Sequence, residues 1–157
     1  MFRIAVGLVV GVLAGSSVHA QQATPPAQPA AAAPNPFVFP GDGGVILNFV
    51  KGDKAADFEM VLGKVKEALA KSTKPERKAQ ATGWKVFKAT EGRPDGGVIY
   101  VFVIDPAQKG GDYSVGNILV QELGAEGQAL YKTYSDSFGT PAIGALLHMN
   151  KVADFGQ

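Results

Sequence analysis

Hydrophobic runs of strand length recur through the last two thirds of the chain. Residues 45–50 (VILNFV) and 98–104 (VIYVFVI) are rich in β-branched and aromatic residues, which is typical of strands. Residues 83–89 (GWKVFKA) and 142–149 (AIGALLHM) carry weaker forms of the same pattern. The sequence therefore predicts four strands.

The hydrophobic positions change to a helical spacing after the first expected strand. Asp53 is suited to cap a helix. The hydrophobic residues that follow it three or four positions apart are Phe58, Val61, Leu62, Val65 and Leu69. Residues 72–81 are polar and include a proline, so we expect a connection there.

A second helical region is expected after the third strand. Ser114 can cap a helix that runs to about Leu123, Gly124 interrupts the pattern, and residues 126–138 continue it. Residues 139–141 (Gly-Thr-Pro) are expected to end this helix.

The expected element order is β-α-β-β-α-β, with the second helix broken. Residues 91–97 are almost all turn formers, so the second and third strands should form a hairpin. This order predicts an α+β fold of the ferredoxin-like type, in which a four-stranded antiparallel sheet carries its helices on one face.

Side chains alternate between the two faces of the third expected strand. Its aliphatic residues Ile99, Val101 and Val103 suit contact with the helices. Tyr100 and Phe102 would then point to the opposite face of the sheet.

An aromatic pocket is expected on that opposite face. Its candidate ligand-binding residues are Trp84, Tyr100, Phe102 and His148. The alternative is that these side chains fill a homodimer interface, because soluble monomers rarely expose a large apolar patch.

The first 20 residues have the parts of a secretory signal peptide. Arg3 precedes an apolar run, and Val18 and Ala20 occupy the A-x-A-like cleavage positions. Residues 21–42 are rich in proline and alanine and are expected to form a disordered linker. Residues 43–157 are then a single domain of an exported protein, periplasmic or secreted, with no membrane span after signal removal.

Composition excludes several kinds of site from the mature chain. Of the 15 basic residues only Arg3 is removed with the signal, so the remaining basic residues balance the 14 acidic ones. The chain has no cysteine, and His148 is the one histidine that remains after cleavage. Thiolate nucleophiles, Fe–S clusters and zinc sites built from several Cys or His residues are therefore excluded. We expect no metal and no other cofactor.

The chain resembles the dimeric α+β barrel superfamily in its expected element order and in four segments. These are residues 57–58 (DF), 84–87 (WKVF), 98–106 (VIYVFVIDP) and 130–134 (LYKTY). The superfamily includes antibiotic-biosynthesis-monooxygenase-like and stress-responsive barrel domains, and the chain is most similar to uncharacterised exported bacterial proteins of this type. The resemblance covers residues 44–150 and implies a domain that dimerises through its sheet.

Some enzymes of that superfamily degrade haem, or oxidise polyketides without a metal, with an Asn, a Trp and a His. The same residue types occur here as Asn48, Trp84 and His148. The resemblance therefore implies these three as candidate catalytic residues. In the haem-degrading members the His lies on a helix, whereas His148 is expected in a strand.

Positive charge is concentrated in the segment from Lys64 to Lys88. It holds eight basic residues and only two acidic ones, Glu67 and Glu76. Such a segment could bind a polyanion, or it could be a solvated helix face and loop. The residues that could offer a complementary acidic surface are Asp112, Glu122, Glu126 and Asp136.

These observations favour an exported, non-catalytic α+β barrel domain that forms a homodimer through its sheet and binds a small apolar ligand. One alternative is a cofactor-independent monooxygenase or haem-handling enzyme, and another is a surface interaction module that uses the basic segment. A nucleic-acid partner is not expected, because the mature chain has no net charge and no aromatic pattern of an RNA-binding domain.

Export should remove residues 1–20. We expect the intact mass of the secreted form to correspond to a chain that begins at Gln21, as glutamine or pyroglutamate. A full-length cytoplasmic protein would contradict the signal-peptide interpretation.

Overall fold

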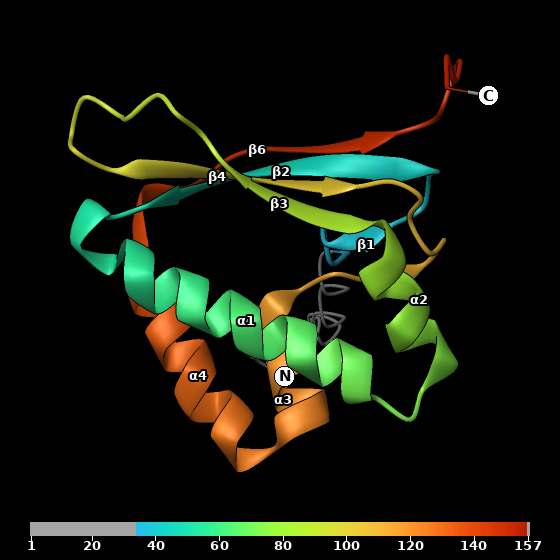
Figure 1. Ribbon diagram of the computed structural model, residues 1–157, viewed down its shortest axis with the longest axis horizontal. Coiled ribbons are helices and arrows are strands. Elements are labelled where there is room, and N and C mark those ends of the chain that lie inside the picture. The colour runs from blue at the N-terminus through green and yellow to red at the C-terminus, as the bar shows by residue number, and fades with distance from the viewer. Residues whose placement is uncertain (1–33, 157) are drawn as a thin grey trace, which may run out of the picture. The chain divides into compact units, whose positions relative to one another are not determined.

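Two long hydrophobic strands form the centre of a four-stranded antiparallel sheet in the computed structural model of the chain, which describes residues 34–156 (Figure 1). β2 (Gly43–Val50) pairs with β4 (Val98–Ile104). β3 (Trp84–Lys88) flanks β4 and β6 (Phe138–Met149) flanks β2, so the strand order is β3-β4-β2-β6. The predicted α+β class and four-stranded antiparallel sheet are confirmed.

The helices of the described residues lie on one side of this sheet (Figure 1). The chain leaves β2 through the 3-10 helix η1 (Gly52–Lys54) and enters α1 (Ala55–Lys71). Phe58, Val61 and Leu69 of α1 are buried, as the helical spacing predicts. No helix in this part of the chain is long and apolar enough to cross a membrane.

Two short helices replace the single second helix of the simplest β-α-β-β-α-β arrangement. α3 (Val115–Leu123) and α4 (Ala125–Asp136) are separated by Gly124, at the predicted break. Gly124 has a φ of +59°, a conformation that glycine adopts without steric cost. Both helices pack against α1, so one layer of helices covers the sheet.

The prediction of a connection at residues 72–81 is wrong, because α2 (Pro75–Gly83) begins inside it. Proline is favoured in the first turn of a helix, where its missing N–H costs nothing. The buried side of α2 is polar: Arg77 donates to Gln80 and to the backbone oxygen of Asp112. A helix held by polar contacts has no hydrophobic periodicity from which it could be predicted.

β6 also begins earlier than predicted: residues 139–141 are expected to end the preceding helix, but α4 ends at Asp136 and these residues belong to the strand. Proline cannot donate a backbone hydrogen bond, so it is tolerated mainly in edge strands. β6 is the edge strand beside β2 and therefore accommodates Pro141.

The folded unit includes residues that the sequence assigns to the linker. β1 (Val38–Phe39) pairs with β5 (Gly111–Asp112), and Phe39 is completely buried. A Cβ at Gly44 would overlap the Phe39 ring, so the backbone of β2 forms part of the site where this ring packs. The predicted boundary at residue 43 is therefore wrong, while the predicted signal peptide and residues 21–33 lie outside the described residues.

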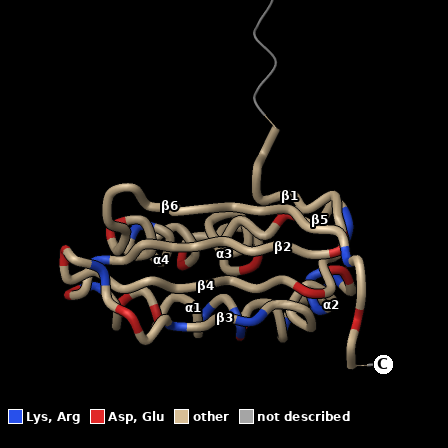
Figure 2. The backbone as a smooth tube through the Cα atoms, turned by 90° about the horizontal axis from the view of Figure 1, so that it is seen from above, with Lys and Arg blue, Asp and Glu red and all other residues tan. Residues whose placement is uncertain are grey.

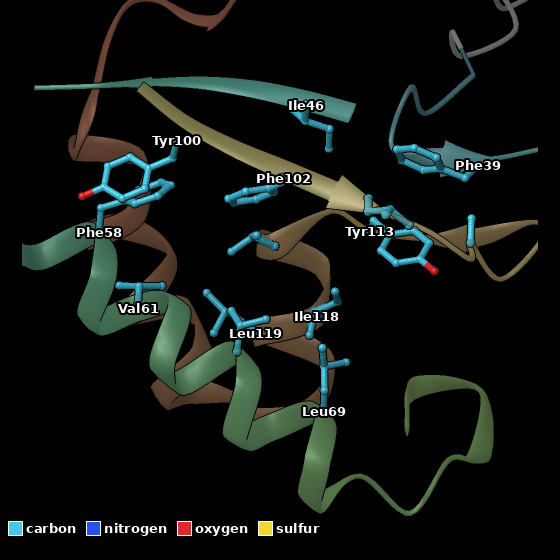
Figure 3. Close-up of a cluster of buried hydrophobic side chains, with 14 of the residues drawn as sticks. Phe39, Ile46, Phe58, Val61, Leu69, Tyr100, Phe102, Tyr113, Ile118 and Leu119 are labelled. Carbon is cyan, nitrogen blue, oxygen red and sulfur yellow. The ribbon is translucent and has the colours of Figure 1, made fainter. Parts of the chain in front are cut away.

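The expected orientation of the third predicted strand, β4, is reversed in the structure. Tyr100 and Phe102 are buried against the helices, where both contact Phe58 of α1 (Figure 3). The layer between sheet and helices needs bulky side chains to fill it, and aromatic rings supply more volume than valines. The aliphatic residues of β4 consequently face away from the helices.

An apolar surface, here called the open face, covers the side of the sheet that bears no helix. The pairing register assigns to it Val45, Leu47 and Phe49 of β2, Phe87 of β3, Ile99, Val101 and Val103 of β4, and Ala145, Leu147 and Met149 of β6. Lys85 of β3 is the one charged strand residue on this face. In the view from above, β2, β4 and β6 carry no charged residue along their length (Figure 2).

Replacement of Phe58 by alanine should strongly destabilise the fold. Its ring has no exposed surface and lies 4.7–6.2 Å, centroid to centroid, from Tyr100, Phe102, Tyr134 and Phe138. We expect Phe58→Ala to lower the free energy of unfolding by about 3–5 kcal/mol, measured by urea denaturation. Met60→Ala, two residues along α1 and exposed, should change it by less than about 0.5 kcal/mol. Equal effects of the two substitutions would contradict this packing.

Candidate functional site

A cavity of about 670 Å³ lies between the sheet and the helices α3 and α4. β2, β4 and β6 contribute Ile46, Phe102 and Ile143 to one wall, and α3 and α4 contribute Val115 and Tyr134 to the other. Sites that bind small molecules usually measure roughly 300–1,000 Å³ and are mostly apolar. In size and lining, this cavity is therefore suited to a small apolar molecule.

Asn48 places an amide in the sheet wall of this cavity. Only 1% of its surface is exposed. Its Nδ2 donates to the backbone oxygens of Ile46 and Tyr100 at 3.4 Å, which is long for a hydrogen bond. Its Oδ1 accepts no hydrogen bond from any residue of the range 34–156, and it keeps some accessible surface. Asn48 Oδ1 is therefore the atom of the sheet wall that a hydrogen-bond donor of a ligand could reach.

The sheet is irregular at Asn48. Asn48 pairs with Ile143 and Leu47 with Ala145, which leaves Gly144 as an extra residue in β6. A second shift in register follows between Asn48 and Val50. Such bulges re-aim side chains and are common beside functional sites.

Tyr134 of α4 brings a phenol to the opposite wall. Its ring stacks on Phe58 and meets Phe138 edge to face. No hydrogen bond to its hydroxyl occurs within the described residues. Burial raises the pKa of Tyr134 well above its ordinary value, so the hydroxyl stays protonated and can donate a hydrogen bond.

No residue that lines the cavity is Asp, Glu, Lys, Arg or His. Its polar groups are the amides of Asn35, Asn48 and Asn117 and the hydroxyls of serines and tyrosines. A buried charge is stable only when an opposite charge or several hydrogen bonds compensate it. The cavity therefore fits an uncharged molecule better than a carboxylate, phosphate or ammonium.

The N-terminal segment and the start of α3 form one end of the cavity. Asn35 Nδ2 donates to Ser114 Oγ at 3.1 Å, and Asn117 Nδ2 donates to Asp112 Oδ2 at 2.6 Å. Although burial raises the pKa of Asp112, hydrogen bonds from Ser114 and Asn117 hold it below its usual range. Phe37 continues this wall, so residues that the sequence assigns to the linker line the cavity.

Of the four predicted ligand-binding residues, only Phe102 lines this cavity. Tyr100 is buried elsewhere, where its hydroxyl donates to Glu59. Trp84 packs against Phe102 and Tyr113, and its Nε1 is buried without a partner. His148 is exposed at the edge of the sheet, where its Nε2 lies 2.9 Å from the backbone oxygen of Pro36. The expected aromatic pocket on the open face is thus wrong.

The proposed catalytic trio is not brought together. Trp84 pairs with Ile104, and His148 pairs with Gly44 on the far side of the two central strands. These two residues are therefore three strand spacings, or about 14 Å, apart across the sheet. Asn48 lies four residues further along β2 than Gly44, which adds about 13 Å along the strand. The three side chains cannot act on one small molecule in this fold.

Five of the eight basic residues of the segment from Lys64 to Lys88 lie close to acidic residues, most of which are outside the segment. Lys74 and Arg77 both approach Glu122, at 3.0 and 3.8 Å, and Lys64 lies 3.8 Å from Glu126. Lys71 pairs with Glu67, and Lys88 pairs with Glu59. Two of the four candidate acidic residues thus bind this segment within the same domain. Lys66, Lys78 and Lys85 have no ion-pair partner among residues 34–156.

Within residues 34–156 no three His, Asp or Glu residues gather as a metal site would require. The sequence does not predict the lining residues of α4 or those of the segment before β1. Asn35 and Phe37 fall in the expected linker, and nothing in their pattern points to a cavity. The 3.6-residue period of α4 places Tyr131, Tyr134 and Ser135 on one side of the helix, and this spacing is the one signal that points to these three residues.

The chain was compared with protein-family models, curated proteins and solved structures. None of them matches it.

The raised pKa of Tyr134 predicts a loss of stability at alkaline pH. A group whose pKa is raised by folding stabilises the native state below its ordinary pKa, near 10 for tyrosine, and loses this contribution as pH rises toward the raised value. We expect the free energy of unfolding to fall between pH 9 and pH 11, and to fall less in Tyr134→Phe. Urea denaturation at both pH values measures this difference. An equal fall in both proteins would show that Tyr134 ionises normally.

Proposed function

We propose that this protein is an exported, non-catalytic binding protein for a small, uncharged and largely apolar molecule. In this proposal the molecule occupies the cavity between the sheet and α3 and α4, and the open face of the sheet joins two copies into a homodimer. The signal-like residues 1–20 support export.

The observation that carries the binding proposal is the unpartnered Oδ1 of Asn48 in an otherwise apolar and uncharged wall. A ligand with one hydrogen-bond donor would satisfy this atom while its apolar part fills the cavity. Tyr134 could supply a donor from the opposite wall to an acceptor on the same ligand. A few fixed polar groups in an apolar cavity are the usual basis of orientation and specificity in ligand sites.

Binding is favoured over catalysis by the chemistry of the lining. General acid–base catalysis uses a group whose pKa lies near the working pH. The cavity offers neutral amides and hydroxyls, and the phenol of Tyr134 has its pKa raised away from neutrality. His148, the one imidazole of the expected mature chain, lies outside the lining.

The open face supports the homodimer. Ten apolar side chains from four strands lie on it, and the sheet places a single lysine among them. Leu147 and Phe87 are more than half exposed. Soluble monomers rarely leave so large an apolar patch in water. Its charged groups lie toward the margin, with Lys85 on the edge strand β3 and the Arg93 guanidinium 4.1 Å from the Phe49 ring.

The strand order supports the proposed relationship to the dimeric α+β barrel superfamily. In the ferredoxin-like split β-α-β fold, the first and third strands are central and the second and fourth are at the edges. With β1 and β5 set aside, the order β3-β4-β2-β6 follows this arrangement, and α2 is an addition before the second strand. Fold alone does not assign a function, so the function proposed here rests on the cavity.

Three naphthalene derivatives of nearly equal shape can test the proposed ligand class. 2-Naphthol is neutral and can donate to Asn48, naphthalene has no donor, and 2-naphthoate is an anion at pH 7. We expect calorimetric titration to rank their affinities in that order, with 2-naphthol about 5–10-fold tighter than naphthalene for one added hydrogen bond.

Asn48→Leu should remove the preference for 2-naphthol while leaving naphthalene binding nearly unchanged. Asn150→Leu makes the same exchange outside the cavity and should preserve the preference. Tightest binding of 2-naphthoate, or an unchanged preference in Asn48→Leu, would refute the proposed site.

A further inference from the structure

The segment that follows β6, residues 150–156, carries two hydrophobic side chains that contact almost nothing. We call this segment the C-terminal arm. Val152 is 98% exposed and Phe155 is 100% exposed, more than any other large hydrophobic residue of the described chain. A fully exposed phenylalanine leaves about 150 Å² or more of apolar surface in contact with water. Single exposed hydrophobics are common, but two on one short arm point to a contact that the isolated chain lacks.

The arm is held in a defined course by polar contacts at its root. Lys151 donates its backbone N–H to Asp42 Oδ2 at 3.1 Å, and its Nζ lies 3.5 Å from Asp105 Oδ1. Within the arm, Asp154 accepts from Lys151 Nζ at 3.2 Å and from the backbone N–H of Gly156 at 3.1 Å. The two charged side chains of the arm, Lys151 and Asp154, are therefore paired within one copy of the chain, while Val152 and Phe155 remain exposed.

The arm leaves the domain on the side of the open face. Figure 1 shows it rising from the end of β6, above the sheet and away from the helices. In Figure 2 it crosses the end of the sheet and extends past β3. A second copy packed on the open face would lie on the side toward which the arm rises.

The open face and the C-terminal arm together reach the size of a stable interface. Four strands about 4.8 Å apart, with about seven residues each at 3.4 Å, cover about 450 Å² in plan, and the side chains that project from them present more accessible surface than this. Interfaces of standard size bury about 800 Å² on each partner. Phe155 and Val152 would add roughly 250 Å² of apolar surface to the open face.

We propose that the C-terminal arm of each copy binds the other copy of this chain, with Phe155 and Val152 packed against the partner's apolar surface. This inference rests on the proposed homodimer and adds the residues that complete its interface. It also explains why the arm carries two large hydrophobic side chains that are almost fully exposed in one copy of the chain.

Sedimentation velocity of the mature protein over a dilution series tests the proposal. We expect Phe155→Ser to weaken dimerisation at least tenfold without changing the thermal unfolding of the monomer. Met60→Ser removes an exposed hydrophobic side chain from α1 and should leave dimerisation unchanged. A dimer that is equally tight in Phe155→Ser would overturn the role of the arm while the proposed dimer stands. A wild-type protein that stays monomeric at every concentration would overturn both.

A spin label distinguishes binding to the partner from folding back onto the same copy. The chain has no cysteine, so Ala153→Cys offers a single labelling site on the arm that keeps both Val152 and Phe155. The label should be immobilised in the dimer and become mobile when Leu147→Glu, on the open face, separates the copies. An immobilised label in the Leu147→Glu monomer would show that the arm packs on its own domain and would overturn the proposal.

Discussion

The alternation of side chains along β2 and β4 is the constraint on which the rest of the structure depends. The register that pairs Ile46 with Phe102 places the bulky residues of both strands on the helix side. The same register pairs Leu47 with Val101 on the open face. A shift of one residue would exchange the two faces and expose the aromatic core. One pairing therefore decides both which residues build the core and which surface remains available to a partner.

On the helix side, large aromatic rings and a cavity occur in the same layer. Phe58 lies among Tyr100, Phe102 and Tyr134 and fills the part of the layer beneath α1. Beneath α3 and α4 the layer is not filled, and the alternation along β2 turns Asn48 toward this space. Within the described residues its oxygen accepts no hydrogen bond, and a binding role accounts for a polar group at this position. In the homodimer proposed here, the open face would be buried by a second copy.

The sequence predicts the strands and helices that bury hydrophobic side chains. It does not predict α2, which polar contacts hold in place. The four strands, the stripe of α1 and the break at Gly124 follow from periodicity and glycine. α2 could not be predicted because Arg77 and Gln80 anchor it through hydrogen bonds. The facing of β4 also could not be predicted, since both of its faces are hydrophobic and only the packing against Phe58 distinguishes them. Of the candidate site residues, Asn48 and Phe102 line the cavity, whereas Trp84 and His148 pair with distant strand positions.

Methyl NMR of the mature protein titrated with 2-naphthol tests most directly whether the two faces of the sheet have different roles. We predict chemical-shift changes at Ile46, Ile143 and Val115, which line the cavity. The methyl groups of Leu47 and Val101, on the open face, should not respond to the ligand. Shift changes confined to the open face, with Ile46 and Ile143 unmoved, would contradict the account.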